Sequence, residues 1–180
     1  MNAPDEARRK LVRQLQGAYS GELAAGHAYR GHWRSVSDPA EREHIQSIEA
    51  DEWHHRELVR GLLAELGAAP SPIREAIFWC IGKSIGLLCR IGGWFIPMYG
   101  AGRLERSNIV EYEHAAVYAA ACGREGMLDC LLTMAEVEWE HERYFRERIA
   151  GRALLRVFPL WDAPPPKSAI RRTPPADAAA

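Results

Sequence analysis

Two short stretches of the chain repeat a pattern that could bind metal ions. The sequence reads EWHH at residues 52–55 and EWEH at residues 138–141, so each stretch has Glu three residues before His. On a helix these two side chains lie about 60° apart around the axis and roughly one turn apart along it. One helix could therefore offer a carboxylate oxygen and an imidazole nitrogen to a single metal ion, and two such helices could bind two metal ions. The four residues concerned are Glu52, His55, Glu138 and His141.

A second repeated pattern precedes each of these stretches. Glu22 is followed seven residues later by Tyr29, and Glu111 is followed at the same spacing by Tyr118. The order Glu…Tyr, ExxH, Glu…Tyr, ExxH predicts two helical hairpins related by an approximate two-fold axis. We expect six residues to bind two metal ions, iron or manganese, as in dinuclear carboxylate bundles: Glu22, Glu52, His55, Glu111, Glu138 and His141. The two tyrosines are candidate catalytic residues that could hydrogen-bond a ligand or relay an electron.

Four segments with helical periodicity are predicted to position these residues. In each segment, residues three and four apart form one apolar face, and a Glu interrupts every one of these faces. An unpaired buried carboxylate is costly, so converging carboxylates on apolar faces indicate a cation between them. The faces are Leu11, Leu15, Ala18, Glu22, Ala25 and Tyr29; Ile45, Ile48, Glu52, His55, Val59, Leu62 and Leu66; Glu111, Ala115, Tyr118 and Cys122; and Met127, Leu131, Met134, Glu138, His141 and Phe145.

Local signals predict where these helices begin and end. Asp38 precedes Pro39 as a helix N-cap, and Gly67 marks the end of the second helix. The third helix should begin near Leu104, and residues 123–126 should form the turn before the fourth. Because no strand-like run competes with these helices, the predicted fold class is all-α, an antiparallel four-helix bundle built from two hairpins.

Composition and charge limit the classes of protein that fit. The chain has 180 residues and a formal net charge of -1, from 23 Lys and Arg against 24 Asp and Glu, which excludes a general nucleic-acid binder. We predict a single domain over residues 1–161 and a flexible tail, rich in Pro and Ala, over residues 162–180. The first residues lack the apolar run of a signal peptide, which favours the cytoplasmic side of a membrane.

The two predicted hairpins are joined by an apolar segment, residues 76–102. Its only charged residues are Lys83 and Arg90, and its longest charge-free run is 12 residues. A membrane-spanning helix needs about 20 apolar residues. Lys83 and Arg90 are seven residues apart and share one face, which favours a helix lying in the membrane interface with both basic side chains reaching the headgroups. A dimer core and a full span are the alternatives.

Taken together, these motifs resemble a known family. The stretches GELAAGHAYRGHW around Glu22 and EWHHREL at 52–58, the apolar segment, and the late EWEHE are similar to the demethoxyubiquinone monooxygenase family of the ferritin-like superfamily, over roughly residues 15–148. The resemblance implies a membrane-peripheral di-iron enzyme that hydroxylates the ring of a ubiquinone precursor with O2 and reduction ultimately from NADH. By position, it implies the same six metal ligands.

The chain departs from the family at two places, and these leave alternatives open. Val117 stands before Tyr118 where the family commonly has His, and after the second ExxH the chain turns basic and then Pro-rich. One alternative function is a ferritin-like iron-handling or peroxide-scavenging protein with no organic substrate, which would be a homo-oligomer whose dimer interface buries the apolar segment. Another is a metal-free membrane adaptor. Glu113 is a fallback ligand, and His114 could add or orient a ligand.

Overall fold

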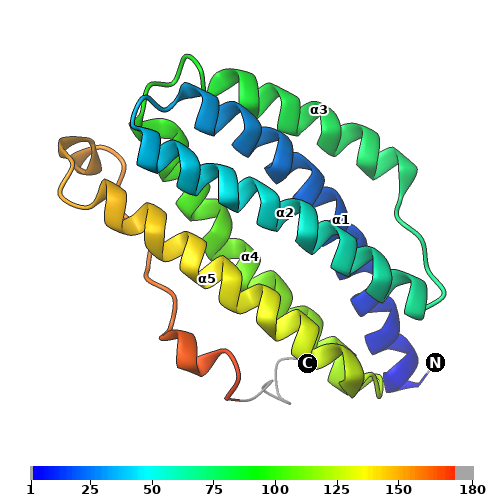
Figure 1. Cartoon of the computed structure of the whole chain (residues 1–180). Helices are drawn as coiled ribbons and strands as arrows, with labels where there is room; N and C mark the ends of the chain where they lie inside the picture. The colour runs from blue at the N-terminus through cyan, green and yellow to red at the C-terminus, as the bar shows by residue number, and fades with distance from the viewer. Residues whose placement is uncertain (1, 173–180) are drawn as a thin grey trace. The chain divides into compact units, whose positions relative to one another are not determined.

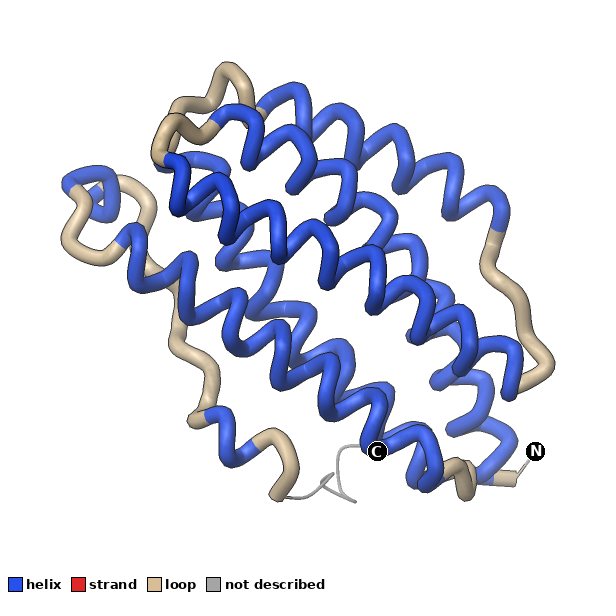
Figure 2. Tube along the Cα trace, in the orientation of Figure 1, coloured by secondary structure: helices blue, strands red, loops and turns tan. Residues whose placement is uncertain are grey.

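The computed structural model describes residues 2–172, which form five α-helices and no strand (Figures 1 and 2). The all-α prediction is therefore confirmed, and the arrangement is compatible with a helical bundle. The helices are α1 (Ala3–Ser35), α2 (Pro39–Glu65), α3 (Pro72–Leu88), α4 (Phe95–Ala121) and α5 (Leu128–Ile149). Short 3-10 turns lie at Glu125–Met127, Ala153–Arg156 and Lys167–Ala169.

The chain divides into two compact units. One unit is Leu15–Pro97, which holds most of α1 together with α2 and α3. The other unit is made of the residues before Leu15 and those from Met98 onward, with the start of α1, most of α4 and all of α5. We call them the α1–α3 unit and the α4–α5 unit. The continuous helix α1 contributes residues to both.

The periodic faces predicted for α1, α2 and α5 are buried along their whole length. The predicted start of α2 is also confirmed, because the Asp38 carboxylate accepts a hydrogen bond of 2.8 Å from the backbone N–H of Glu41. Gly67 follows the end of α2 with φ of 62°, a conformation that glycine adopts without strain. Apolar periodicity therefore correctly predicted the buried faces of α1, α2 and α5, three of the helices that carry predicted ligands.

Helix α4 begins at Phe95 and not near Leu104. Pro97 lies in its first turn, where backbone N–H groups have no acceptor within the helix, so a proline there costs no hydrogen bond. Gly102 is tolerated because the ring of Trp161 lies against it, at 2.5 Å from where a Cβ would stand. The apolar segment 76–102 consequently comprises α3 from residue 76 onward, a turn around Gly93 and the first two turns of α4.

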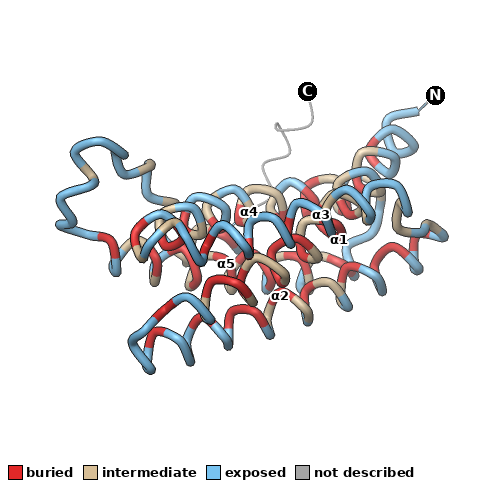
Figure 3. The backbone as a smooth tube through the Cα atoms, turned by 90° about the horizontal axis from the view of Figure 1, so that it is seen from above, coloured by how far each residue is buried: buried red, intermediate tan, exposed pale blue. Residues whose placement is uncertain are grey.

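Helix α3 packs on α1 through glycines. A Cβ added to Gly31 of α1 would lie 2.1 Å from the carbonyl oxygen of Gly86, and one on Gly82 would lie 2.5 Å from that of Ala24. These distances mean that the two backbones touch. Gly82 and Gly86 are the only buried residues of α3, whose trace is mostly exposed in Figure 3.

The outward side of α3 and the turn after it is apolar. Ile73 is 76% exposed and Ile91 is 78% exposed, and several other large apolar side chains are exposed between them, among them Ile77, Trp79, Ile81, Ile85, Leu87 and Leu88. Large exposed apolar surfaces are typical of interaction sites. Within residues 2–172, no helix combines the length and hydropathy that crossing a membrane requires.

The segment after α5 lies along that helix as far as residue 172. Trp139 of α5 donates a hydrogen bond to the carbonyl of Pro165, and Arg171 pairs with Asp129 and Glu136. These contacts raise the pKa of Arg171, chiefly through its hydrogen bond to Glu136. Of the tail predicted to be flexible, residues 162–172 make these contacts, and residues 173–180 lie outside the described residues.

The glycine crossing makes a prediction about stability. We expect Gly31→Ala to lower the free energy of unfolding by about 1–3 kcal/mol, because the new methyl group would displace the α3 backbone. Gly21→Ala is the matched control on the same helix, since nothing lies within 4 Å of its Cβ position. It should instead raise stability by roughly 0.5–1 kcal/mol. Urea unfolding measures both, and equal effects would contradict a backbone contact at Gly31.

The second prediction concerns the pH dependence of stability and rests on His32, which is buried near the end of α1. Desolvation lowers its pKa to about 4, and the nearby Glu41 carboxylate opposes this only in part. Between pH 6.5 and 4 the unfolded chain therefore binds a proton that the folded chain does not. Stability should fall as the pH falls through this window, by up to about 3 kcal/mol from this residue. Urea unfolding at several pH values should show a shallower dependence for His32→Gln, and parallel curves would refute the assignment.

Candidate metal centre

In the α1–α3 unit, three predicted ligands are buried on facing helices. Glu22 comes from α1, and Glu52 and His55 come from α2, where they are one turn apart on the buried face. A carboxylate oxygen of Glu22 and a ring nitrogen of His55 lie within 4.8 Å of each other. This separation allows one cation to contact both atoms.

Another buried acid, Glu49, fixes the position of α2 beside α1. Its carboxylate accepts hydrogen bonds from Arg30 at 2.8 Å, from Trp33 at 2.6 Å and from Trp53 at 3.1 Å. Glu49 lies one turn before Glu52 on the same helix. With three donors on its two oxygens, Glu49 acts as a link between helices that orients the ligand face of α2.

The α4–α5 unit brings together a second group of ligands. Ligand atoms of Glu105 from α4 and of Glu138 and His141 from α5 all lie within 4.8 Å of one another. Both carboxylates are fully buried, and His141 is 5% exposed. The Nδ1 atom of His141 lies 3.5 Å from a carboxylate oxygen of Glu138. The helix spacing of three residues predicted this pair.

Electrostatics favour a cation in this second group. Two ionised carboxylates with oxygens within 4.8 Å repel each other by at least about 3.5 kcal/mol at an effective dielectric constant of 20. Burial adds a desolvation penalty to each ionised group. A divalent cation between Glu105 and Glu138 would turn this repulsion into attraction. The set of carboxylate oxygens and an imidazole nitrogen suits iron or manganese.

The acid that α4 contributes is Glu105, whereas the sequence predicted Glu111. Glu111 is half-buried and belongs to neither ligand group found among residues 2–172. Six residues separate the two, which places them about 120° apart around the helix axis. The buried line of α4 explains the choice, because it runs through Glu105, Ile109, Tyr112, Ala116 and Ala119. The geometry thus favours Glu105 over Glu111.

The same helix contains two overlapping Glu…Tyr pairs. Glu105 precedes Tyr112 by seven residues, which is the spacing of Glu22 and Tyr29. Tyr29 and Tyr112 are both buried, whereas Tyr118 is half-buried and has the Lys10 ammonium group 5.9 Å from its ring centroid. The sequence signal that could have found Glu105 is therefore the seven-residue spacing itself, read one pair earlier.

Two further candidates on α4 lie away from the ligand group. His114 is exposed. Glu113 is half-buried, and burial raises the pKa of its carboxyl group against the opposing effect of Arg106. Neither residue belongs to a ligand group within the described part of the chain.

Comparison of the chain with models of known protein families, with curated proteins and with solved structures finds no match. The candidate centre is consequently defined by its own geometry.

Replacing each of the two acids of α4 in turn tests whether Glu105 or Glu111 is the metal ligand. We expect Glu105→Gln to weaken Fe(II) or Mn(II) binding by at least about tenfold, a loss that even outer-shell changes produce at metal sites. The glutamine keeps an oxygen that can accept the 3.0 Å hydrogen bond from Asn108. Glu111→Gln is the matched control and should bind metal as the unaltered chain does. Anaerobic metal titration measures both, and the reverse order of effects would restore Glu111 as the ligand.

Proposed function

We propose that this protein is a di-iron oxidoreductase of the ferritin-like type, which hydroxylates a ubiquinone-precursor ring with O2 and reducing equivalents. The observation that carries the proposal is the repeat of one buried ligand set: each compact unit holds two acids and one His on facing helices. The ligands proposed are Glu22, Glu52, His55, Glu105, Glu138 and His141. Glu105 takes the place predicted for Glu111.

The donor chemistry of these residues fits the proposed metal. Four carboxylates and two imidazoles would hold two iron ions, with manganese as the other ion that such a set accepts. When bound, iron in such a centre supplies the activation of O2. The carboxylates would hold the cations and neutralise their charge, and each His would supply a ring nitrogen from the next turn of the same helix.

The protein's own side chains would control the surroundings of the reaction. Tyr29 and Tyr112 are buried seven residues after a proposed ligand, so each phenol follows its acid on the same helix face. We propose that Tyr29 donates a hydrogen bond to a ligand or relays an electron, as predicted from the sequence. We propose that Tyr112, in place of Tyr118, does the same in the other unit. The apolar residues on either side of the acids, such as Ile48 and Leu131, are fully buried and exclude water.

The exposed apolar side of α3 supports a lipid-soluble substrate. A polyprenyl quinone resides in the bilayer, and a helix with large apolar side chains exposed can lie in the membrane interface. We therefore propose peripheral attachment through the segment 76–102, on the cytoplasmic side. The electron donor in the family that the sequence resembles is ultimately NADH, and we extend that donor to this chain as part of the proposal.

The test uses the purified protein with Fe(II), a reductant, O2 and a demethoxyquinone. We expect a hydroxylated ring that carries 18O when 18O2 is supplied, and we expect Glu138→Ala to abolish the product because it removes a buried ligand. Glu140→Ala is the matched control, since this acid lies on α5 with its side chain 42% exposed and pairs with Arg143 and Lys167.

The remaining outcomes decide between the alternatives. Iron-dependent O2 or peroxide consumption without any quinone product would replace the proposal with an iron-handling protein of the same fold. Two results together would eliminate both the hydroxylase and the iron-handling protein and leave the metal-free adaptor. These are the absence of iron binding and a free energy of unfolding for Glu138→Ala equal to that of the unaltered chain.

A further inference from the structure

The crossing of α1 and α3 forms a pocket that lies apart from the proposed metal ligands. Its volume is about 220 Å3, less than the roughly 300–1,000 Å3 of sites for drug-sized ligands. Gly31 of α1 and Gly86 of α3 line it, and the contact between their backbones leaves no side chain at the crossing itself. Glu22 and Gly31 are nine residues apart, so the pocket and the ligand Glu22 lie on opposite faces of α1.

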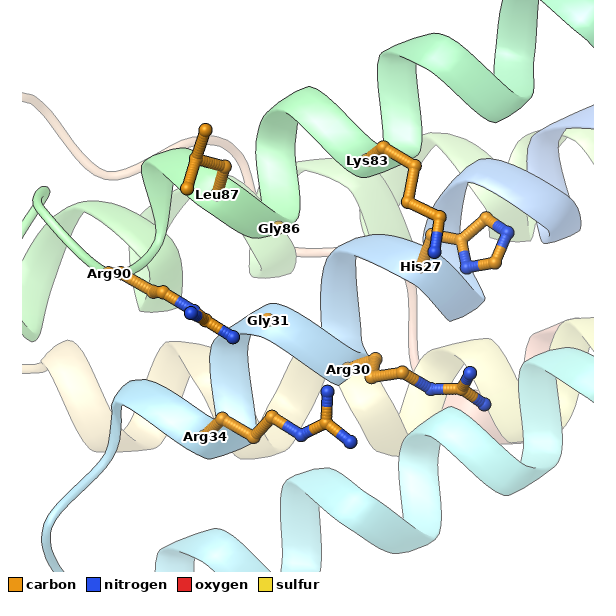
Figure 4. A pocket seen from close by; sticks show the side chains of 8 residues that line it. All are labelled: His27, Arg30, Gly31, Arg34, Lys83, Gly86, Leu87 and Arg90. Atoms are coloured by element: carbon orange, nitrogen blue, oxygen red, sulfur yellow. The ribbon is translucent and has the colours of Figure 1, made fainter.

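Basic side chains surround this pocket. Figure 4 shows Lys83 extending from α3 toward His27, and Arg90 extending toward Gly31 from the turn after α3. Arg34 approaches from α1, while Arg30 turns toward α2, where it pairs with Glu49 at 2.8 Å. The chain as a whole has a net charge of -1, so this concentration of positive charge is local.

Three of these cations have no carboxylate partner in the part of the chain that the structure describes. Arg34, Lys83 and Arg90 form no ion pair with any residue between 2 and 172, whereas Arg30 is neutralised by Glu49. Arg34 lies 4.8 Å from the ring centroid of Trp33, and Lys83 lies 5.5 Å from that of Trp79. These aromatic contacts orient the cations without cancelling their charge.

His27 provides an independent sign of an unfilled polar site. Its Nδ1 atom is buried and accepts or donates no hydrogen bond within the described residues. Burial and then the Lys83 ammonium group lower its pKa, so the ring is neutral at pH 7 in the absence of an anion. Its contacts with Trp53 and Trp79, at 5.4 and 6.3 Å between centroids, hold the ring at the edge of the pocket.

We propose that this pocket binds a phosphate group. Two guanidinium groups and one ammonium group match the oxygens and the charge of a phosphomonoester or a diphosphate. A single carboxylate would neutralise only one of the three cations. Leu87 also lines the pocket and is 64% exposed, so acyl chains could continue from a bound headgroup onto the apolar side of α3. The phosphate can therefore belong to an anionic lipid or to a soluble phosphate compound.

The test compares two variants that lose the same charge. In the pocket variant, Arg34, Lys83 and Arg90 are changed to Gln. In the control variant, the exposed residues Arg13, Arg74 and Arg156 are changed to Gln, so both chains have a net charge of -4, three less than -1. Arg74 lies on α3 itself, which makes the control sensitive to general attraction of this helix to a charged surface.

Two binding measurements separate the two sources of phosphate. The first is sedimentation with vesicles of phosphatidylcholine, with and without phosphatidic acid, and the second is calorimetric titration with inorganic pyrophosphate. We expect binding in at least one of them, weakened at least about tenfold in the pocket variant and retained in the control, because charge-assisted hydrogen bonds to phosphate are lost. Selective loss on vesicles alone assigns a lipid, and selective loss with pyrophosphate assigns a soluble compound.

Equal weakening of both variants, or no binding by the unaltered protein in either measurement, overturns the proposal. If the pocket variant fails to show the helical circular dichroism of the unaltered chain, the single variants Arg34→Gln and Arg90→Gln repeat the comparison against Arg74→Gln. Neither measurement requires iron or turnover, so the phosphate site can fail while the proposed enzyme stands, and the reverse is also true.

Discussion

The interaction on which this structure depends is the repulsion between carboxylates buried in apolar helix interfaces. Glu22, Glu52, Glu105 and Glu138 are all at most 3% exposed. Apolar residues on the preceding and following turns force these acids inward, because moving one acid to the solvent would expose a whole helix face. The packing energy of the helices thus holds the acids at buried positions where a cation would stabilise them, and this is the physical basis for proposing a metal centre.

Helix α1 lies between the two sites proposed for the α1–α3 unit. One face carries Glu22 toward α2, and the opposite face carries Gly31 against α3. Glycine at the crossing lets the backbones touch, so side chains of both helices are displaced to the rim, where Arg34, Lys83 and Arg90 gather. Close packing at one point therefore creates both the stability of α3 and the basic pocket beside it.

The sequence predicted α1, α2 and α5 well because their apolar faces are separated from charged faces, and the ligands interrupt those faces. Helix α4 lacks this contrast. Alanines lie on several sides of it, and the pairs Glu105…Tyr112 and Glu111…Tyr118 have the same spacing, so periodicity could not choose between them. The α1–α3 crossing was not predictable either, because a glycine becomes informative only when its neighbouring helix is known. Lys83 and Arg90 were expected to share one helix face; both line the pocket, although Arg90 lies in the turn after α3. The pocket also needs Arg34 from another helix.

Helix α3 attaches to α1 mainly through glycines and leaves its large apolar side chains exposed, which is unfavourable in water. A second copy of the chain or a membrane surface could cover them. A symmetric dimer through this face would bring two copies of the same basic pocket to one interface, and like charges would then oppose the apolar gain. An anionic membrane surface offers apolar chains to Leu87 and Leu88 and phosphates to the cations beside them. The combination of an apolar face with unneutralised basic residues at its edge therefore favours a membrane surface over a second copy.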